Sequence, residues 1–376
     1  MKIVICPNSF KGCLSSIKVA KIIRIEIKKL IPSVELINFP IADGGDGTLE
    51  VLKNVIGGKF IEVKASDPLL RKLKTKYIKN RKNAYIEMAK VSGLCLLKED
   101  EKNPLKTTTY GLGELILDAI RRKCKKIYIG VGGSATNDGG IGALTALGFK
   151  FIDKNGKIIF PGKGEDLLNI DKIEYPENYK DLKKIEFIIL SDVKNPLYGK
   201  NGAAYVYGPQ KGADEKTVKI LDDGLRNYAK IIKKYKNIDV NKINGSGAAG
   251  GIVAGFVSFL DAKVFSGIEE ILKIGKFEDK IKNADLIITG EGRIDRQTFY
   301  GKGVGVILKY STRYKIPTII LAGIIDENIY KFIKSRYISI FSIVPGPCSV
   351  ENSIKNSEKY IKIKTKQLLK FLTMRL

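Results

Sequence analysis

Short apolar runs alternate along this chain with stretches of helical periodicity. The runs are rich in β-branched residues, and each is followed by a polar loop; they lie at 2–6, 35–39, 126–131, 285–290, 318–323 and 338–343. Helical spacing is found at 14–30, 47–56, 111–123 and from about Asp138 onward. Strands that alternate with helices form parallel sheets covered on both faces. The pattern therefore predicts an α/β fold with a doubly wound parallel sheet of about six strands.

Two segments do not follow this alternation. Residues 59–104 contain successive strand-like pieces with no helices between them, and residues 148–279 contain mixed pieces that include the glycine-rich GSGAAGGIVAG. We interpret the two segments as a second α/β lobe inserted into the first, which then comprises 1–58, 105–147 and 280–376. A chain of 376 residues with 44% apolar content can bury two such cores. The crevice between the lobes is the default ligand site.

The composition narrows the classes of partner. The formal charge is +26, but the lysines are spread along the whole chain, which indicates a solvated surface and favours anionic small molecules over nucleic acid. No apolar run reaches the roughly 18 residues of a membrane span, and the first residues do not resemble a signal peptide, so we expect a cytoplasmic protein. The five cysteines form no CxxC pair and are expected to be reduced thiols.

The absence of histidine restricts the chemistry. Without histidine, any acid–base step must use Asp, Glu, Lys or Tyr. The polar loops are rich in Asp, Asn, Ser, Thr and Lys, which are suited to Mg²⁺ and phosphate and not to zinc. No GxxxxGK[ST] sequence occurs, which excludes a P-loop enzyme.

Polar, glycine-containing loops follow several predicted strands. They read PNSFKG (7–12), PIADGGDGT (40–48), VGGSATNDGG (131–140) and GEGRIDRQT (290–298). Parallel strands place such loops at one carboxyl edge, where α/β sheets bind ligands. The loop at 131–140 opens a helix, so we expect the N–H groups of Gly133 to Asn137 to bind phosphate. Two alternatives are a tight packing turn and, for Asp138, a helix N-cap.

Six motifs together resemble the bacterial type-I glycerate kinase family: PNSFKG, PIADGGDGT, GGSATNDGG, LSDVKNPLYGKNGAAYVYGPQKGA, GSGAAGG and LIITGEGRIDRQTFYGKG. The resemblance extends from about Lys2 to Ile343. It implies ATP-dependent phosphorylation of D-glycerate, Mg²⁺ as cofactor, and a Rossmann- or flavodoxin-like lobe with a second lobe inserted. Two positions differ from the family pattern: Asn8 replaces an Asp, and Arg296 replaces a small residue.

The candidate site residues are assigned by their places in these loops. Asp192 is expected to act as the general base, with Lys11 and Arg293 as the cations for the substrate carboxylate or the transferring phosphoryl group. Substrate contacts are assigned to Ser9, Asp43, Asn195, Glu291 and Asp295. Nucleotide phosphate contacts are assigned to Gly132, Gly133, Ser134, Thr136 and Asn137. Asp46 and Asp138 are assigned to Mg²⁺.

Several alternatives stay open at the level of sequence. Lys11 could cap a surface turn, Asp43 and Asp46 could be helix caps, and Arg293 could pair with its neighbours Glu291 and Asp295. The GxGxxG at 245–250 suggests a dinucleotide-dependent dehydrogenase, although no convincing strand precedes it. A nucleotide-binding protein or a kinase for another hydroxy acid are further alternatives. Phosphorylation at the 2-hydroxyl is favoured, and a homodimer is left open.

Overall fold

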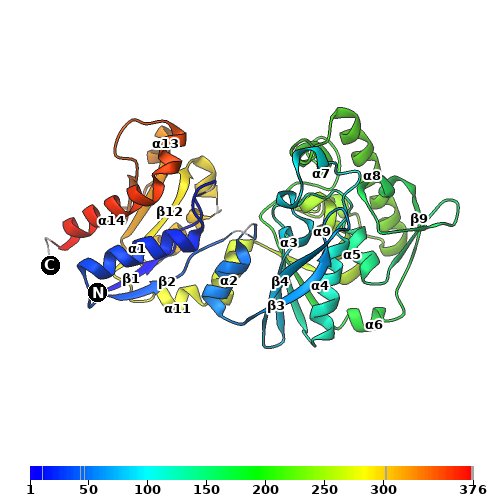
Figure 1. Ribbon diagram of the computed structural model, residues 1–376, viewed down its shortest axis with the longest axis horizontal. Coiled ribbons are helices and arrows are strands. Elements are labelled where there is room, and N and C mark those ends of the chain that lie inside the picture. The colour runs from blue at the N-terminus through cyan, green and yellow to red at the C-terminus, as the bar shows by residue number, and fades with distance from the viewer. Residues whose placement is uncertain (11, 43, 46, 301–302, 374–376) are drawn as a thin grey trace. The chain divides into compact units, whose positions relative to one another are not determined.

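The computed structural model describes residues 1–10, 12–42, 44–45, 47–300 and 303–373 (Figure 1). The chain divides into two units, each with its own core. Unit 1 comprises Met1–Asp43, Glu50–Gly57 and Ile268–Leu376, and unit 2 comprises Gly44–Leu49 and Gly58–Gly267. The prediction of an α/β fold with parallel strands is confirmed.

Unit 1 is built on a five-stranded parallel sheet. Its strands are β1 (Lys2–Ile5), β2 (Glu35–Asn38), β12 (Leu286–Ile294), β13 (Thr318–Ile325) and β14 (Ile338–Ser342). They lie in the order β14-β13-β12-β1-β2, and all neighbours are parallel. Counted within the unit, this order is 2-1-3-4-5, the flavodoxin-like order of doubly wound sheets.

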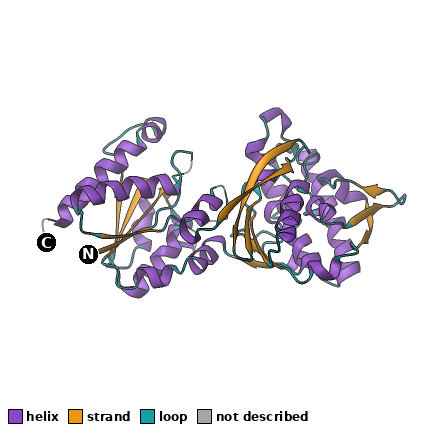
Figure 2. Cartoon of the chain, turned by 60° about the horizontal axis from the view of Figure 1, so that its bottom comes forward, coloured by secondary structure: helices purple, strands orange, loops and turns teal. Residues whose placement is uncertain are grey.

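Helices cover both faces of this sheet, because its strands are apolar on both sides (Figure 2). Ile3 and Ile5 point to the face covered by α1 (Ser16–Leu30) and α14 (Ser357–Thr373). Val4 points to the opposite face. That face is covered by α10 (Gly267–Ile274), α11 (Phe277–Ile281) and α12 (Val304–Tyr314). Two further helices of the chain are α2 (Thr48–Ile56) and α13 (Val350–Lys355).

Unit 2 contains a six-stranded mixed sheet in the order β11-β10-β6-β5-β4-β3. The strands are β3 (Lys59–Ser66), β4 (Lys72–Asn80), β5 (Asn83–Glu87), β6 (Lys126–Gly130), β10 (Glu186–Leu190) and β11 (Lys263–Phe265). β5, β6, β10 and β11 are parallel, whereas β3, β4 and β5 are antiparallel. A small antiparallel sheet has β8 (Ile158–Ile159), β7 (Lys150–Asp153) and β9 (Ile170–Glu174).

The helices of unit 2 pack around this sheet in one large core. They are α3 (Ala89–Ser92), α4 (Tyr110–Arg121), α5 (Ile141–Ala146), α6 (Tyr179–Leu182), α7 (Ala203–Tyr207), α8 (Glu215–Lys236) and α9 (Ala248–Leu260). Among the residues that the structure describes, no helix combines the length and apolar character needed to cross a membrane.

The two units differ from the predicted lobes at 44–49 and 268–279, and most of all at 105–147. We had placed residues 105–147 with the first lobe, but β6 pairs with β5 and β10 in unit 2. Ile127 and Ile129 of β6 belong to the same core as Leu112 of α4. An apolar run followed by a helix has the same local pattern in either sheet, so the pattern does not specify which strands pair. The parallel sheet of unit 1 consequently has five strands.

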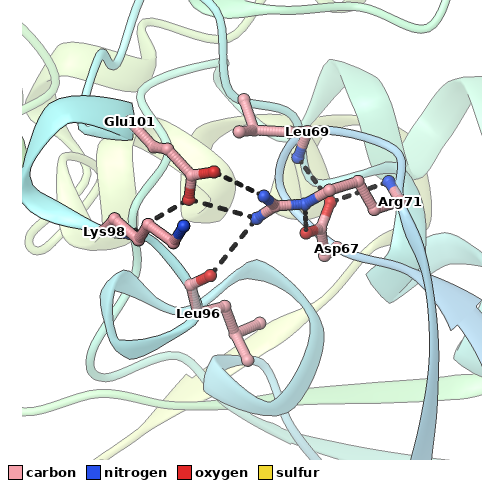
Figure 3. A network of polar contacts seen from close by, with 6 residues as sticks. All are labelled: Asp67, Leu69, Arg71, Leu96, Lys98 and Glu101. Atoms are coloured by element: carbon pink, nitrogen blue, oxygen red, sulfur yellow. Dashed lines mark hydrogen bonds and ion pairs between the residues drawn. The ribbon is translucent and has the colours of Figure 1, made fainter.

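A polar network fastens the turn between β3 and β4 of unit 2 (Figure 3). The buried carboxylate of Asp67 accepts hydrogen bonds from the N–H groups of Leu69 and Arg71, each at 2.8 Å, and from Nε of Arg71. The rest of the Arg71 guanidinium donates to Glu101 and to the carbonyl of Leu96. The network therefore joins the turn to the 3₁₀ segments that follow α3.

We expect Asp67→Ala to lower the free energy of unfolding by about 2 kcal/mol, because it leaves two backbone N–H groups without their acceptor. Glu101→Ala is the matched control, and its effect should be clearly smaller because its partner Arg71 is half exposed and can bind water. Urea unfolding followed by circular dichroism measures both variants. Equal losses for the two variants would contradict this account.

Candidate active site

Unit 1 has a cavity at the carboxyl ends of its central strands. Its volume is about 800 Å³, and it is lined by residues that follow β1, β12, β13 and β14. The strand order reverses between β1 and β12, since β2 lies on one side of this pair and β13 and β14 lie on the other. Ligands of doubly wound sheets bind at such a switch point.

Polar side chains form one part of the cavity wall. Asn8 follows β1 and is only 7% exposed, and its Oδ1 accepts a hydrogen bond from the N–H of Ser9 at 2.8 Å. Glu291 accepts a hydrogen bond from the hydroxyl of Thr298 at 2.8 Å. Gly303, at the start of α12, adopts φ +50°, and a Cβ there would lie 3.0 Å from Nδ2 of Asn8. Glycine thus lets the chain pass close to this amide.

Arg293 lines the same cavity without an ion-pair partner among the residues that the structure describes. It belongs to the carboxyl-terminal part of β12 and is exposed. The alternative that Arg293 pairs with Glu291 or Asp295 is therefore wrong. An exposed guanidinium in a cavity can bind a carboxylate or phosphate with two parallel hydrogen bonds.

Apolar side chains line the same cavity. Ile324, Val350 and Ile354 line the cavity, and they are 41%, 61% and 44% exposed. Large apolar side chains that gather at an exposed site usually mark a place where another molecule binds. The two kinds of side chain adjoin where Arg293 of β12 pairs in register with Ile324 of β13. We call the apolar residues the apolar wall and the polar residues, which include Asn8 and Arg293, the polar wall.

In unit 2, two predicted site loops follow neighbouring parallel strands. Gly130 of β6 pairs with Leu190 of β10, so the loop after β6 and Asp192 lie at the same edge of this sheet. Asp192 is half-buried. The amide of Asn195 is used within its own turn, because it donates to the carbonyl of Asn201 and accepts from the hydroxyl of Tyr207. The assignment of Asn195 to the substrate thus has no support from its contacts.

In the glycine-rich loop at 131–140, which we predicted to bind phosphate, part of the backbone N–H groups is used within the protein. The N–H groups of Gly132, Ala135 and Thr136 already donate to Gly44, Ser92 and Ser134. The segment Ser134–Gly140 is buried, and α5 behind it has only six residues.

The glycines of this loop have a packing role instead. A Cβ at Gly132 would lie 2.5 Å from Cα of Gly45. Without side chains here, the loop leaves room for the segment from Gly44 to cross the ends of β6 and β10.

Asp138 is likewise a structural residue, in contrast to its predicted role as a Mg²⁺ ligand. Its carboxylate is fully buried and accepts four hydrogen bonds, two from Thr109 and one each from the N–H groups of Gly140 and Gly142. Burial raises the pKa of Asp138, and these hydrogen bonds oppose that shift. Both of its oxygens accept hydrogen bonds from protein donors. The side chain ties the start of α4 to the start of α5.

Asn137 differs from its neighbours in this loop. It is fully buried, yet neither atom of its amide has a hydrogen-bond partner among the described residues. Buried polar groups are almost always hydrogen-bonded, to protein, water or ligand. The amide of Asn137 therefore has hydrogen-bonding capacity that the described residues do not use.

Lys211 is a buried cation that the sequence reasoning did not assign to the site. It is 3% exposed, and its Nζ donates to the carbonyl of Thr136 at 2.6 Å and to the hydroxyl of Ser134 at 3.3 Å. Burial lowers its pKa to about 8, and the charge of Asp138 offsets part of this shift. The available signal was the sequence GPQKGA, where a single lysine stands between glycines.

Comparison with known proteins decides the family. A profile of the glycerate kinase family matches residues 3–373. A glycerate kinase of Bacillus cereus is 40% identical over 370 residues, which cover 98% of this chain and 97% of that protein. The glycerate 2-kinase of Escherichia coli is 38% identical, covering 95% and 94% of the two chains. This chain belongs to the glycerate kinase family. The predicted resemblance is confirmed, and the protein is a kinase.

A solved structure supports the same conclusion for the fold. The crystal structure of a Salmonella typhimurium LT2 protein assigned as glycerate kinase 2 superimposes with a TM-score of 0.86 at 36% identity. The match covers 100% of this chain and 98% of that one. The architecture described above is therefore that of a glycerate kinase.

A dedicated cage for Mg²⁺ is absent from the part of the chain that the structure describes, where no three carboxylate or cysteine side chains gather. Mg²⁺ in kinases is commonly held by substrate phosphates, water and one or two carboxylates. The predicted residues Lys11, Asp43 and Asp46 lie outside the described residues. Asp295 and Ser9 line the cavity of unit 1.

We expect the buried Lys211 to make stability depend on pH. Its pKa is about 8 in the folded protein and about 10.4 in an unfolded chain, so the unfolded state binds more protons between these values. The free energy of unfolding contributed by Lys211 therefore rises with pH from about 8 to about 10 and is lost as the pH falls through 8. Lys211→Met should remove this rise.

Urea unfolding of wild type and variant at several pH values measures the difference. Lys216→Met, at an exposed position of α8, is the control and should follow the wild-type pH dependence. Parallel curves for wild type and Lys211→Met would show that the ammonium is not buried in solution.

Proposed function

We propose that this protein transfers the γ-phosphoryl group of ATP to the 2-hydroxyl of D-glycerate, with Mg²⁺ bound to the nucleotide phosphates. The observation that carries the proposal is the guanidinium of Arg293, which has no ion-pair partner among the described residues and stands in the cavity at the switch point of unit 1. The 2-hydroxyl is chosen because the Escherichia coli relative is named a glycerate 2-kinase.

Phosphoryl transfer needs charge stabilisation and positioning more than covalent chemistry from the protein. Arg293 supplies a fixed positive charge for the transferring group or for the carboxylate of glycerate. Mg²⁺, carried by ATP, neutralises further charge on the phosphates. Because the chain has no histidine, the acceptor hydroxyl must lose its proton to another group.

Asp192 is the residue we propose for that role. It follows β10 at the carboxyl edge of the unit 2 sheet, next to the loop that carries Asn137. A half-buried carboxylate in this position can orient the hydroxyl and accept its proton as the oxygen attacks. The amide of Asn137, which no described residue contacts through a hydrogen bond, can bind a polar group of the same acceptor.

We expect Asp192→Asn to lower kcat by roughly two to four orders of magnitude with little change in ATP affinity, because it removes proton acceptance but keeps the shape. ADP release measures kcat, and ³¹P NMR of the wild-type product should show 2-phosphoglycerate. Asp223→Asn, an exposed position of α8, is the control and should retain wild-type turnover. Near wild-type kcat in Asp192→Asn would remove this residue from the role.

We expect Arg293→Lys to lower kcat/KM at least tenfold, equivalent to about 1.4 kcal/mol, because an ammonium cannot replace the two parallel hydrogen bonds of a guanidinium. Arg24→Lys, an exposed position of α1, is the matched control. Steady-state kinetics with each substrate varied in turn measures the effect. Unaltered kinetics in Arg293→Lys would mean that the guanidinium contacts neither substrate.

A further inference from the structure

We propose that the cavity of unit 1 binds ATP, with the adenine ring against its apolar wall and the phosphates at its polar wall. The inference deepens the proposed kinase activity by assigning the donor substrate to one unit. It moves the nucleotide away from the loop at 131–140, where the sequence had placed it, because the N–H groups of that loop are largely used within the protein.

The size of the cavity separates the two substrates. Pockets of roughly 300–1,000 Å³ hold molecules of the size of drugs and cofactors. At about 800 Å³, this cavity has room for a nucleotide. Glycerate, a three-carbon acid, would leave most of this volume to water.

The apolar wall matches a flat aromatic base. Ile324 at the end of β13 and Ile354 of α13 are both more than two-fifths exposed, although they line one cavity together. Glycerate offers no apolar surface that would cover such side chains. An adenine ring buries both of its faces when it lies between aliphatic groups, which removes apolar surface of ligand and protein from water together.

The polar wall matches the phosphates. Arg293 offers a cation without an ion-pair partner among the described residues, and Asn8 brings an amide that is more than nine-tenths buried. Ser9 lies beside that amide. Neutral donors and a guanidinium are the groups that phosphates select.

The assignment changes the roles of three residues. Ser9, Glu291 and Asp295 were predicted to contact glycerate, but all three line this cavity. We assign them to the donor nucleotide and its Mg²⁺ instead. Glycerate is then left to the residues at the carboxyl edge of the unit 2 sheet.

Cysteine labelling tests the occupant directly. Cys348 is exposed and lines the cavity, whereas Cys95 is exposed in unit 2. The rate of alkylation by N-ethylmaleimide is measured for each by peptide mass mapping. ATP with Mg²⁺ should slow the labelling of Cys348 at least fivefold and leave Cys95 unchanged, and glycerate alone should protect neither.

A charged substitution tests the apolar wall. Ile354→Glu places a carboxylate where adenine would lie, and we expect ATP to bind at least tenfold more weakly by calorimetry while glycerate affinity changes less than twofold. Ile363→Glu is the matched control, since Ile363 is 43% exposed on α14 and does not line the cavity. It should bind ATP like the wild type.

The outcomes separate this inference from the proposed function. Protection of Cys348 by glycerate, or unchanged ATP affinity in Ile354→Glu, would overturn the nucleotide assignment even if the enzyme phosphorylates glycerate. Conversely, protection of Cys348 by ATP in a protein that does not phosphorylate glycerate would support the nucleotide site and refute the proposed acceptor. Loss of ATP binding in both glutamate variants would also overturn the assignment, because the effect would not be specific to the cavity.

Discussion

The reversal of strand order between β1 and β12 is the constraint on which the site of unit 1 depends. The chain leaves β1 toward α1 on one face of the sheet and leaves β12 toward α12 on the other. The two loops therefore diverge, and no crossover fills the space beyond the strand ends. Asn8, in the loop after β1, and Arg293, near the carboxyl end of β12, line the same cavity although most of the chain separates them.

In unit 2, charged and small polar residues stabilise a buried loop through hydrogen bonds. Burying the carboxylate of Asp138 is costly unless each lone pair finds a donor, and the surrounding loop supplies donors from Thr109 and from two glycine N–H groups. Lys211 then balances the carbonyl and hydroxyl groups that point inward from the same loop. Small polar residues and glycines are needed here because the backbone itself is the hydrogen-bonding partner.

The sequence predicts elements of this fold well and their pairing less well. The runs at 2–6, 285–290 and 318–323 correspond to β1, β12 and β13 within a few residues, because alternation of apolar and polar positions is a local property. Which sheet a strand joins depends on contacts far away in the chain. The run at 126–131 was therefore assigned to the wrong sheet, since it looks like any other buried parallel strand.

The difference between local patterns and long-range contacts applies to the candidate site as well. Arg293 and Asp192 could be proposed from the sequence because each lies close to the end of a predicted strand. The role of the loop at 131–140 could not be read in that way. Glycine, serine, threonine and asparagine suit both a phosphate cradle and a tightly packed loop. Only the hydrogen-bond partners of each N–H group, which the fold determines, separate the two.

The chain has 66 basic residues, and composition alone does not identify which of them binds a ligand. The ion pairs of each residue in the fold give that information. Arg71 is an arginine with a structural role. Its guanidinium forms ion pairs with Asp67 and Glu101 and stabilises the turn between β3 and β4. Arg293 has the same chemistry, but the residues described around it offer no ion pair, and it stands in a cavity. A cation that the fold leaves without a counterion gains most from an arriving anion, since no existing ion pair has to be broken. The partners of each arginine, more than its presence in the sequence, therefore make Arg293 the candidate for ligand binding and Arg71 a structural residue.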